Sequence, residues 1–251
     1  MARPVRLRVA PSPTGSLHVG TARTAIFNYL YARKFHAPLL LRIEDTDTER
    51  SKQEFVDDIQ SGLDWLGIEF NGLIFQSKRT PLYEEAVRKL LGTGRAFYCS
   101  HPPRSGPPGM PHVCDDRDKN LTSGIIRFRN DATDAVVFTD IIRGEIRTDP
   151  ATMGDFAIAV APERPLFLLA NVVDDAEMEI SHVIRGEDHI TNVPKQILIG
   201  SALGAETPAW AHLPLILGAD RSKLSKRHGA TPVIDYKEEG YLADALFNFL
   251  A

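Results

Sequence analysis

Two short segments of the chain carry the residue types that phosphate chemistry needs. The first, Pro11–Gly20, has the pattern Pro-x-Pro-x-Gly-x-x-His-x-Gly. If its backbone N–H groups lie at a helix start, they would bind phosphate. His18 can donate a hydrogen bond to a phosphate oxygen, and Gly20 lets a nucleotide come close to the backbone. Taken alone, the segment can also be interpreted as a strand-to-helix turn with an incidental histidine.

The second segment, Lys223–Arg227, places Ser225 between two lysines, Lys223 and Lys226. Lysine is a compact charge on a flexible stem, which suits it to follow a departing pyrophosphate. One positioned cation at a developing charge typically contributes ~3–4 kcal/mol to catalysis. Alone, this segment would be interpreted as a solvated basic loop. Together and in this order, the two segments predict one ATP site that activates a carboxylate.

The residues around the first segment predict the elements that hold it. Val5, Leu7 and Val9 alternate with arginines, which indicates a strand, and apolar residues then recur at helical spacing from Ala22 to Leu30. A buried-strand run at 38–43 and an amphipathic helix at 52–66 follow. This β-α-β-α order predicts an α/β fold with a Rossmann-like, doubly wound parallel sheet. Ligands of such sheets bind outside the carboxyl ends of the strands.

The pattern changes after a third predicted helix at 81–93. Residues 98–116 are dense in Pro, Gly and His, and strand-like runs follow at 125–129 and 136–142. The α/β pattern resumes with a helix at 167–175, a strand at 179–185, a helix at 190–203 and a strand at 210–217. We therefore expect an inserted α+β module at 82–163 between two halves of one domain, at 1–81 and 164–217, with the lysine segment inside a final region at 218–251.

The bulk composition excludes several classes of protein. The 251 residues are 43% hydrophobic and carry a net charge of −4, which is ordinary globular composition. A nucleic-acid partner would therefore need a local basic surface. The sequence has no run of 18 apolar residues and no apolar signal core, so we expect a cytoplasmic protein without a membrane span. Two cysteines make no disulfide framework there.

The chain resembles the class I aminoacyl-tRNA synthetases, whose two signature motifs correspond to Pro11–Gly20 and Lys223–Arg227. More narrowly, it is similar to the bacterial glutamyl-tRNA synthetases. That similarity also rests on Leu41–Asp47, Leu169–Asp175 and His182–His189, and it runs nearly end to end apart from a divergent 98–120. It implies a monomer that uses ATP with Mg²⁺ to form glutamyl-adenylate and passes the glutamyl group to the 3′ end of tRNA-Glu. Residues 82–163 would bind the acceptor end of that tRNA.

The resemblance also assigns roles to individual residues. Catalysis would use His18, Lys223 and Lys226. Arg8 and Arg185 would bind the γ-carboxylate of glutamate, because the planar guanidinium binds a carboxylate through two hydrogen bonds. Glu44 would hold the α-ammonium group. The remaining implied contacts are Pro11, Thr14, Gly15, His18, Gly20 and Lys226 for ATP, and Ser12, Phe167 and Asn171 for glutamate.

Phe167 is a departure, because the family usually has tyrosine at this position. The missing phenol would remove one hydrogen bond to the substrate side chain. Such a loss typically costs ~0.5–1.5 kcal/mol, and up to ~3 kcal/mol when the partner is charged. We therefore expect weakened glutamate binding, without loss of activity being implied.

A second departure concerns metal. Some family members carry a zinc site in the inserted module, built from a Cys-x-Cys pair and a downstream tyrosine and cysteine. Here two mirrored pairs, Cys99-x-His101 and His112-x-Cys114, offer a closed tetrahedral zinc site. The alternative is a Pro/Gly loop with incidental histidines.

Three other readings of the function stay open. A glutamyl-queuosine tRNA-Asp synthetase fits the length better and the motifs less well. A catalytically impaired tRNA-binding fragment is favoured by Phe167 and by the terminal segment 240–251, which has helical spacing without a stop signal. A helix that ends in mid-pattern suggests a fragment, and the resemblance implies that the rest of the stem-contact region and an anticodon-binding domain would follow. A pantetheine-phosphate-type nucleotidyltransferase shares the His-x-Gly pattern but leaves Arg8, Glu44 and Arg185 without a common purpose.

Overall fold

The computed structural model describes residues 3–102, 111–218 and 232–251. The chain forms two compact units. Unit 1 contains residues 1–77, 180–190 and 208–251, and unit 2 contains residues 78–179 and 191–207. The limits predicted for the inserted module, 82–163, stay a prediction.

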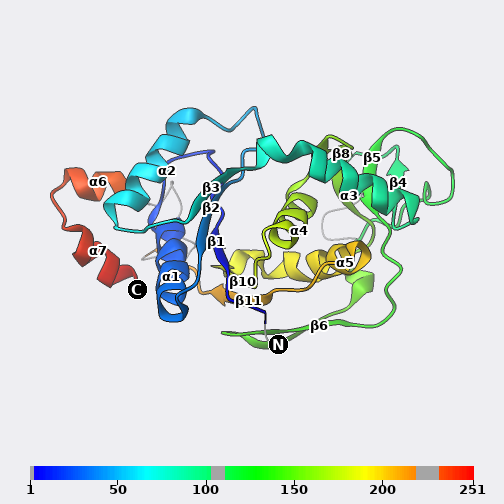
Figure 1. Cartoon of the computed structure of the whole chain (residues 1–251). Coiled ribbons are helices and arrows are strands. Elements are labelled where there is room, and N and C mark those ends of the chain that lie inside the picture. The colour runs from blue at the N-terminus through cyan, green and yellow to red at the C-terminus, as the bar shows by residue number, and fades with distance from the viewer. Residues whose placement is uncertain (1–2, 103–110, 219–231) are drawn as a thin grey trace. The chain divides into compact units, whose positions relative to one another are not determined.

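Unit 1 is built on parallel strands. Its strands and helices are β1 (Leu7–Val9), α1 (Val19–Phe35), β2 (Leu39–Ile43), α2 (Gln53–Trp65), β3 (Gly72–Phe75), β10 (His182–Gly186), β11 (Ala209–Leu213), α6 (Val233–Glu238) and α7 (Ala243–Leu250). Strands β1, β2 and β3 are hydrogen-bonded in that order, and β10 pairs with β11, all parallel. Figure 1 shows α1 alongside the β1–β2–β3 sheet.

The two parallel pairings meet where β10 starts beside β1. The backbone N–H of Ser181 donates to the carbonyl of Arg6 at 3.0 Å, which places β10 on the side of β1 away from β2. The strands therefore lie in the order β3-β2-β1-β10-β11. The chain adds β2 and β3 on one side of β1, and then β10 and β11 on its other side. In open α/β sheets a ligand crevice forms at such a switch point, at the carboxyl ends of the strands. The segments that follow β1 and β10 thus lie where a ligand is expected.

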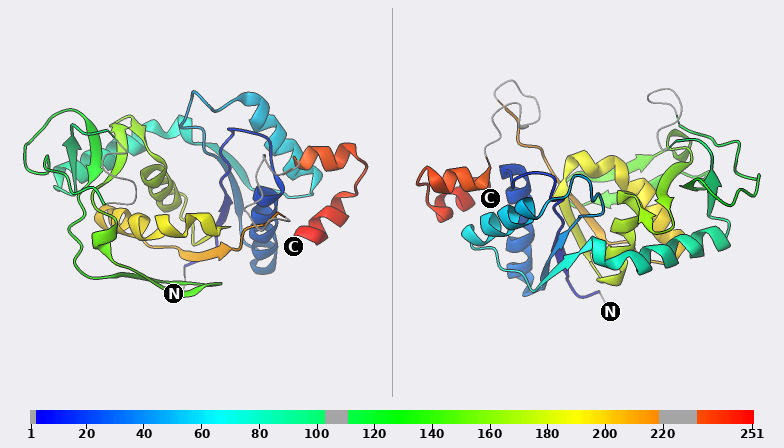
Figure 2. Two further views of the ribbon diagram at one scale, coloured as in Figure 1. Left: turned by 180° about the vertical axis from the view of Figure 1, so that it is seen from behind. Right: turned by 90° about the horizontal axis from the view of Figure 1, so that it is seen from above.

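Unit 2 combines helices with antiparallel strands. Its elements are α3 (Thr80–Gly92), β4 (Ala96–Cys99), β5 (Ile125–Phe128), β6 (Val136–Asp140), β7 (Gly144–Thr148), β8 (Phe156–Ala161), β9 (Arg164–Pro165), α4 (Phe167–Glu177) and α5 (Val193–Leu203). The antiparallel order is β4-β5-β8-β9, and β6 pairs with β7, also antiparallel. Helices α3, α4 and α5 pack together in both views of Figure 2. Their apolar faces share a core with the β4–β5–β8 strands.

These elements confirm the predicted α/β class with a parallel sheet. Three boundaries differ from the sequence expectation. The strand expected at 179–185 starts later, because Glu179 has a φ of 54° and turns the chain before β10. The helix expected from residue 190 begins at Val193, after a 3₁₀ turn at Glu187–Asn192. The strand expected to reach residue 217 ends at Leu213, because the next residue is proline. Within the described residues, no helix has the length and apolarity needed to span a membrane.

Candidate functional site

His18 is the N-cap residue of α1, directly before the first helical residue, Val19. It has extended backbone geometry, and its Nδ1 accepts hydrogen bonds from the backbone N–H groups of Gly20 (3.1 Å) and Thr21 (3.3 Å). A ring nitrogen that accepts carries no proton, so the neutral imidazole has its proton on Nε2. Nε2 lies 3.2 Å from the Thr21 hydroxyl, and the histidine is exposed. The helix cap therefore fixes the tautomer and leaves Nε2–H as a donor at the positive end of α1.

The imidazole of His18 folds over Gly20. A Cβ atom added to Gly20 would lie 3.0 Å from His18 Cε1 and 3.1 Å from Nδ1. The glycine predicted for nucleotide approach thus has a second purpose: it makes room for the ring. This local contact explains the His-x-Gly spacing without any ligand.

The rest of the first segment is anchored by α2 and β2. Leu17, which is buried, donates its backbone N–H to Asp58 Oδ2 at 2.6 Å. The carbonyl of Pro11 accepts from the N–H of Glu44 at 2.9 Å, so the segment and the end of β2 are held together. Gly62 on α2 has no room for a side chain, because a Cβ would meet Leu17 Cδ2 at 2.7 Å. The sequence argument missed Asp58 and Gly62, since nothing near them marks a contact with residue 17.

Buried charges gather around β1, β2 and β10. Arg8 on β1, Glu44 directly after β2 and Arg185 on β10 are exposed by only 3%, 7% and 6%. Arg42 Nη2 lies 3.4 Å from Glu44 Oε1. Arg185 Nε donates to His212 Nε2 at 3.1 Å. These strands are buried on both faces, which is why Arg8 is buried although it alternates with Leu7 and Val9.

His189, in the turn after β10, reports the electrostatics near these arginines. Burial first, and then the positive charge of Arg185, lower the pKa of His189 to about 4, and Arg8 acts in the same direction. Burial is thus the main cause of the lowered pKa, and the positive charges of Arg185 and Arg8 add to it, while Asp188 opposes it. Because the pKa falls below the ordinary 6.5, the stability that a neutral His189 provides is present above pH 6.5 and is lost as pH falls toward 4.

Two further residues assigned to glutamate by resemblance lie on α4, in unit 2. Phe167 is the first residue of this helix, and Asn171, one turn later, is buried. Ser12 and Thr14 are exposed within the first segment. Their assignment to a glutamate or ATP site stays a prediction. Lys223 and Lys226 lie outside the described residues.

The two cysteines and two histidines of unit 2 converge. One ligand atom from each of Cys99, His101, His112 and Cys114 lies within 4.8 Å of all the others. Cys99 Sγ is 3.1 Å from Cys114 Sγ and 3.3 Å from His101 Nδ1, and it is 4.0 Å from His112 Nε2. Burial raises the pKa of the Cys114 thiol to about 11 and lowers the pKa of His112. The mirrored pairs predicted from the sequence therefore form one cluster of soft donors.

A family model for the catalytic domain of class I tRNA synthetases specific for glutamate and glutamine matches residues 4–105 and 111–251. The chain belongs to this family. It is 46% identical over 97% of its length to the glutamate–tRNA ligase of Nitratidesulfovibrio vulgaris strain DP4, and 47% identical over 98% to that of Aquifex aeolicus. It spans about 56% of each of these relatives.

A solved structure gives the same result for the fold. The glutamate tRNA ligase of Elizabethkingia meningosepticum, crystallised in complex with its amino acid, matches with a TM-score of 0.88 and 30% identity. The match covers 99% of this chain and 60% of that one. The class I synthetase fold predicted by resemblance is therefore confirmed.

Two glycines let the backbone come close to the cysteines and histidines of the cluster. Gly124 has a φ of 126°, and a Cβ there would lie 2.5 Å from the Cys99 carbonyl oxygen. Gly154 has a φ of 57°, and a Cβ there would lie 2.7 Å from both N and O of His112. Both positions therefore require glycine on two counts, conformation and space.

Two buried carboxylates hold the backbone beside the cluster. Asp116 accepts from the Ser100 N–H at 2.8 Å and from its hydroxyl at 2.7 Å. Asp155 accepts from the Cys114 N–H at 3.0 Å and from Arg117 at 2.6 Å. The sequence argument identified none of these supports, because each acts on a residue that is distant along the chain or carries no motif of its own.

Proposed function

We propose that this catalytic domain activates glutamate with ATP and transfers it to tRNA-Glu. The observation that carries the proposal is the cap of α1: His18 presents Nε2–H at the helix N-terminus, beside the switch point between β1 and β10. Membership of the glutamate and glutamine synthetase family and the names of the relatives support the choice of reaction.

In the proposed first step, an oxygen of the glutamate α-carboxylate attacks the α-phosphorus of ATP. The bond between the α-phosphorus and its bridging oxygen breaks, and pyrophosphate leaves with that electron pair. His18 Nε2–H donates to a phosphate oxygen as charge builds there. Lys223 and Lys226 would neutralise the leaving pyrophosphate, and Mg²⁺, held mainly by the phosphates, supplies further positive charge when bound. In the second step a terminal ribose hydroxyl of the tRNA takes the glutamyl group and AMP leaves.

The buried charges support glutamate as the amino acid. Arg8 and Arg185 are two buried positive charges, and both act to lower the pKa of His189, so they suit the γ-carboxylate. Glu44, held by Arg42 and buried, suits the α-ammonium group. The resemblance also assigns Ser12, Phe167 and Asn171 to glutamate binding. Phenylalanine at 167 predicts weaker glutamate binding than a tyrosine would give.

Exchange of pyrophosphate into ATP tests the activation step, with glutamate and tRNA-Glu both present. We expect exchange that needs glutamate and is lost in Arg185→Met. No exchange under these conditions would remove the enzymatic proposal for this chain, and ATP binding without adenylate would favour a tRNA-binding role. Charging of tRNA-Glu against queuosine-modified tRNA-Asp decides the acceptor, and transfer to tRNA-Asp alone would replace the proposed acceptor.

We also propose that Cys99, His101, His112 and Cys114 hold one zinc ion. Two thiolates and two imidazoles are a usual set for a closed structural site, and the four donor atoms already lie together. Bound zinc would hold the Cys99-x-His101 and His112-x-Cys114 pairs together. Metal analysis of the purified protein tests this: we expect one zinc per chain, lost in Cys99→Ala. A folded protein without zinc, which also takes up none when it is supplied, would contradict the proposal.

A further inference from the structure

Arg127 is a buried cation beside the cysteine and histidine cluster. It lies on β5, between the core residues Ile126 and Phe128, and only 1% of it is exposed. In the antiparallel register Arg127 is opposite Phe97 on β4. Side chains alternate along a strand, so Arg127, Phe97 and Cys99 share one face of the sheet. Burying a guanidinium costs several kcal/mol unless its N–H groups find acceptors, so its contacts call for an explanation.

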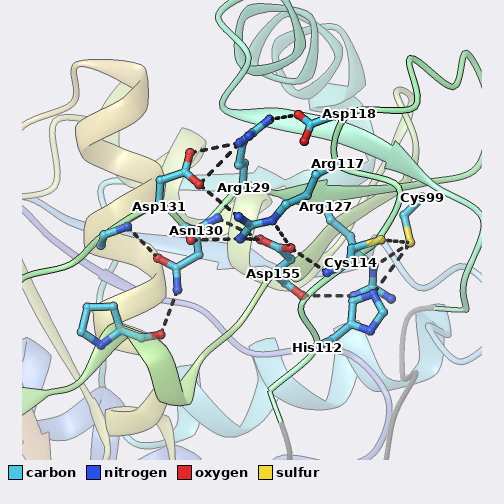
Figure 3. Close-up of polar contacts among 12 residues, drawn as sticks. Cys99, His112, Cys114, Arg117, Asp118, Arg127, Arg129, Asn130, Asp131 and Asp155 are labelled. Atoms are coloured by element: carbon cyan, nitrogen blue, oxygen red, sulfur yellow. Dashed lines mark hydrogen bonds and ion pairs between the residues drawn. The ribbon is translucent and has the colours of Figure 1, made fainter.

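The guanidinium directs its hydrogen bonds at the segments that carry the cluster. Nε donates to Cys99 Sγ at 3.2 Å, and Nη2 donates to the Pro102 carbonyl at 2.6 Å, one residue after His101. Nη1 donates to the Asp155 carbonyl at 3.3 Å. Figure 3 shows Arg127 beside Cys99 and Cys114, with the Asp155 carboxylate on the other side.

Asp155 extends this connection to the second pair of ligands. Its carboxylate accepts from the Cys114 N–H at 3.0 Å, and its own N–H donates to the His112 carbonyl at 2.6 Å. Arg127 therefore contacts Cys99 directly, and it is connected to the second pair through Asp155. Arginine suits this position because its planar group offers several N–H donors in fixed directions, whereas a lysine ammonium is a single point.

We propose that Arg127 is a positioning residue for the zinc site: its Nε–H holds Cys99 Sγ in place and hydrogen-bonds to that sulfur when the metal is bound. The proposal rests on the zinc site proposed above. Groups that hydrogen-bond to metal ligands orient them and tune the metal bond, and their replacement typically lowers metal affinity about 10–100-fold.

Cobalt titration of the metal-free protein tests the assignment, because Co²⁺ bound by thiolate has a sulfur-to-metal absorption band. Arg127→Met is expected to bind Co²⁺ about 10–100-fold more weakly than the wild type, with a shifted band. Arg127→Lys keeps the positive charge but loses the planar guanidinium. Its Co²⁺ affinity should lie between those of the wild type and Arg127→Met. Arg129→Met is the matched control, because Arg129 is two residues away and pairs with Asp118 and Asp131 instead. It should keep wild-type affinity and spectrum.

The outcomes separate the two proposals. A folded Arg127→Met protein with wild-type cobalt affinity and band position would overturn the role of Arg127 and leave the zinc site standing. A folded wild-type protein that takes up neither cobalt nor zinc would overturn both. Circular dichroism of the metal-free proteins establishes folding. If Arg127→Met does not fold, Arg127→Lys decides, and wild-type affinity with an unshifted band in that variant would count against the assignment.

Discussion

Replacing Gly20 with alanine should separate folding from chemistry at the proposed ATP site. The new Cβ would lie 3.0 Å from His18 Cε1 and 3.1 Å from Nδ1, so the imidazole must give way by about a few tenths of an ångström. This shift weakens the two hydrogen bonds that Nδ1 accepts, and a lost helix cap costs about 1 kcal/mol. Alanine in place of glycine in a helix gains up to about 1 kcal/mol. The free energy of unfolding should therefore change by less than about 1 kcal/mol.

Activity should respond much more strongly. A displaced ring holds Nε2–H away from its position at the helix N-terminus. Complete loss of one such donor typically lowers a rate by about 10²–10³-fold, which is the upper limit of the expected effect. Pyrophosphate exchange measures the rate, and urea unfolding measures the stability. Gly92→Ala is the matched control, because Gly92 is also helical and a Cβ there meets nothing within 4 Å. The reasoning is refuted if Gly20→Ala exchanges pyrophosphate within about twofold of Gly92→Ala.

Two further perturbations test the described geometry. Between pH 6.5 and 4 the wild type should lose about 2–3 kcal/mol more stability than His189→Gln, because the half-buried imidazole, with a pKa of about 4, is neutral in the folded state. Urea unfolding across this range checks it, and equal pH slopes would contradict it. Gly154→Ala should destabilise the protein more than Gly94→Ala, since both glycines have positive φ but only the first Cβ would strike His112; equal thermal midpoints would show that the clash is relieved without cost.

Local sequence pattern was sufficient for the elements of unit 1. Apolar periodicity predicted β1, β2 and α2 to within two residues and the middle of α1, because strand and helix periods are properties of neighbouring residues. The same pattern placed Arg8 and Arg185 on strands. Boundaries failed where one residue changed the backbone direction, as at Glu179 with its positive φ. That conformation leaves no periodic trace in the sequence.

The candidate sites were only partly readable from the sequence. The mirrored Cys-x-His and His-x-Cys pairs named the donors, but their meeting within 4.8 Å depends on pairing between β4 and β5 and on Asp155 holding the second pair. Arg127 carried no signal at all, because an arginine between apolar residues in a strand normally points to solvent. Only the covered face of the sheet makes it a buried neighbour of Cys99.

The sequence by itself determined the chemistry on offer: a histidine and glycine at a strand-to-helix turn, buried-strand arginines and four metal-type donors. Residue type and spacing are properties of short segments, so they can be interpreted without knowing how the chain packs. The tertiary structure decided how that chemistry is presented. It fixed the proton of His18 on Nε2 through the α1 cap, placed β10 beside β1, and set Arg127 against a sulfur. Each of these depends on hydrogen-bond directions and burial, which exist only once distant segments have packed.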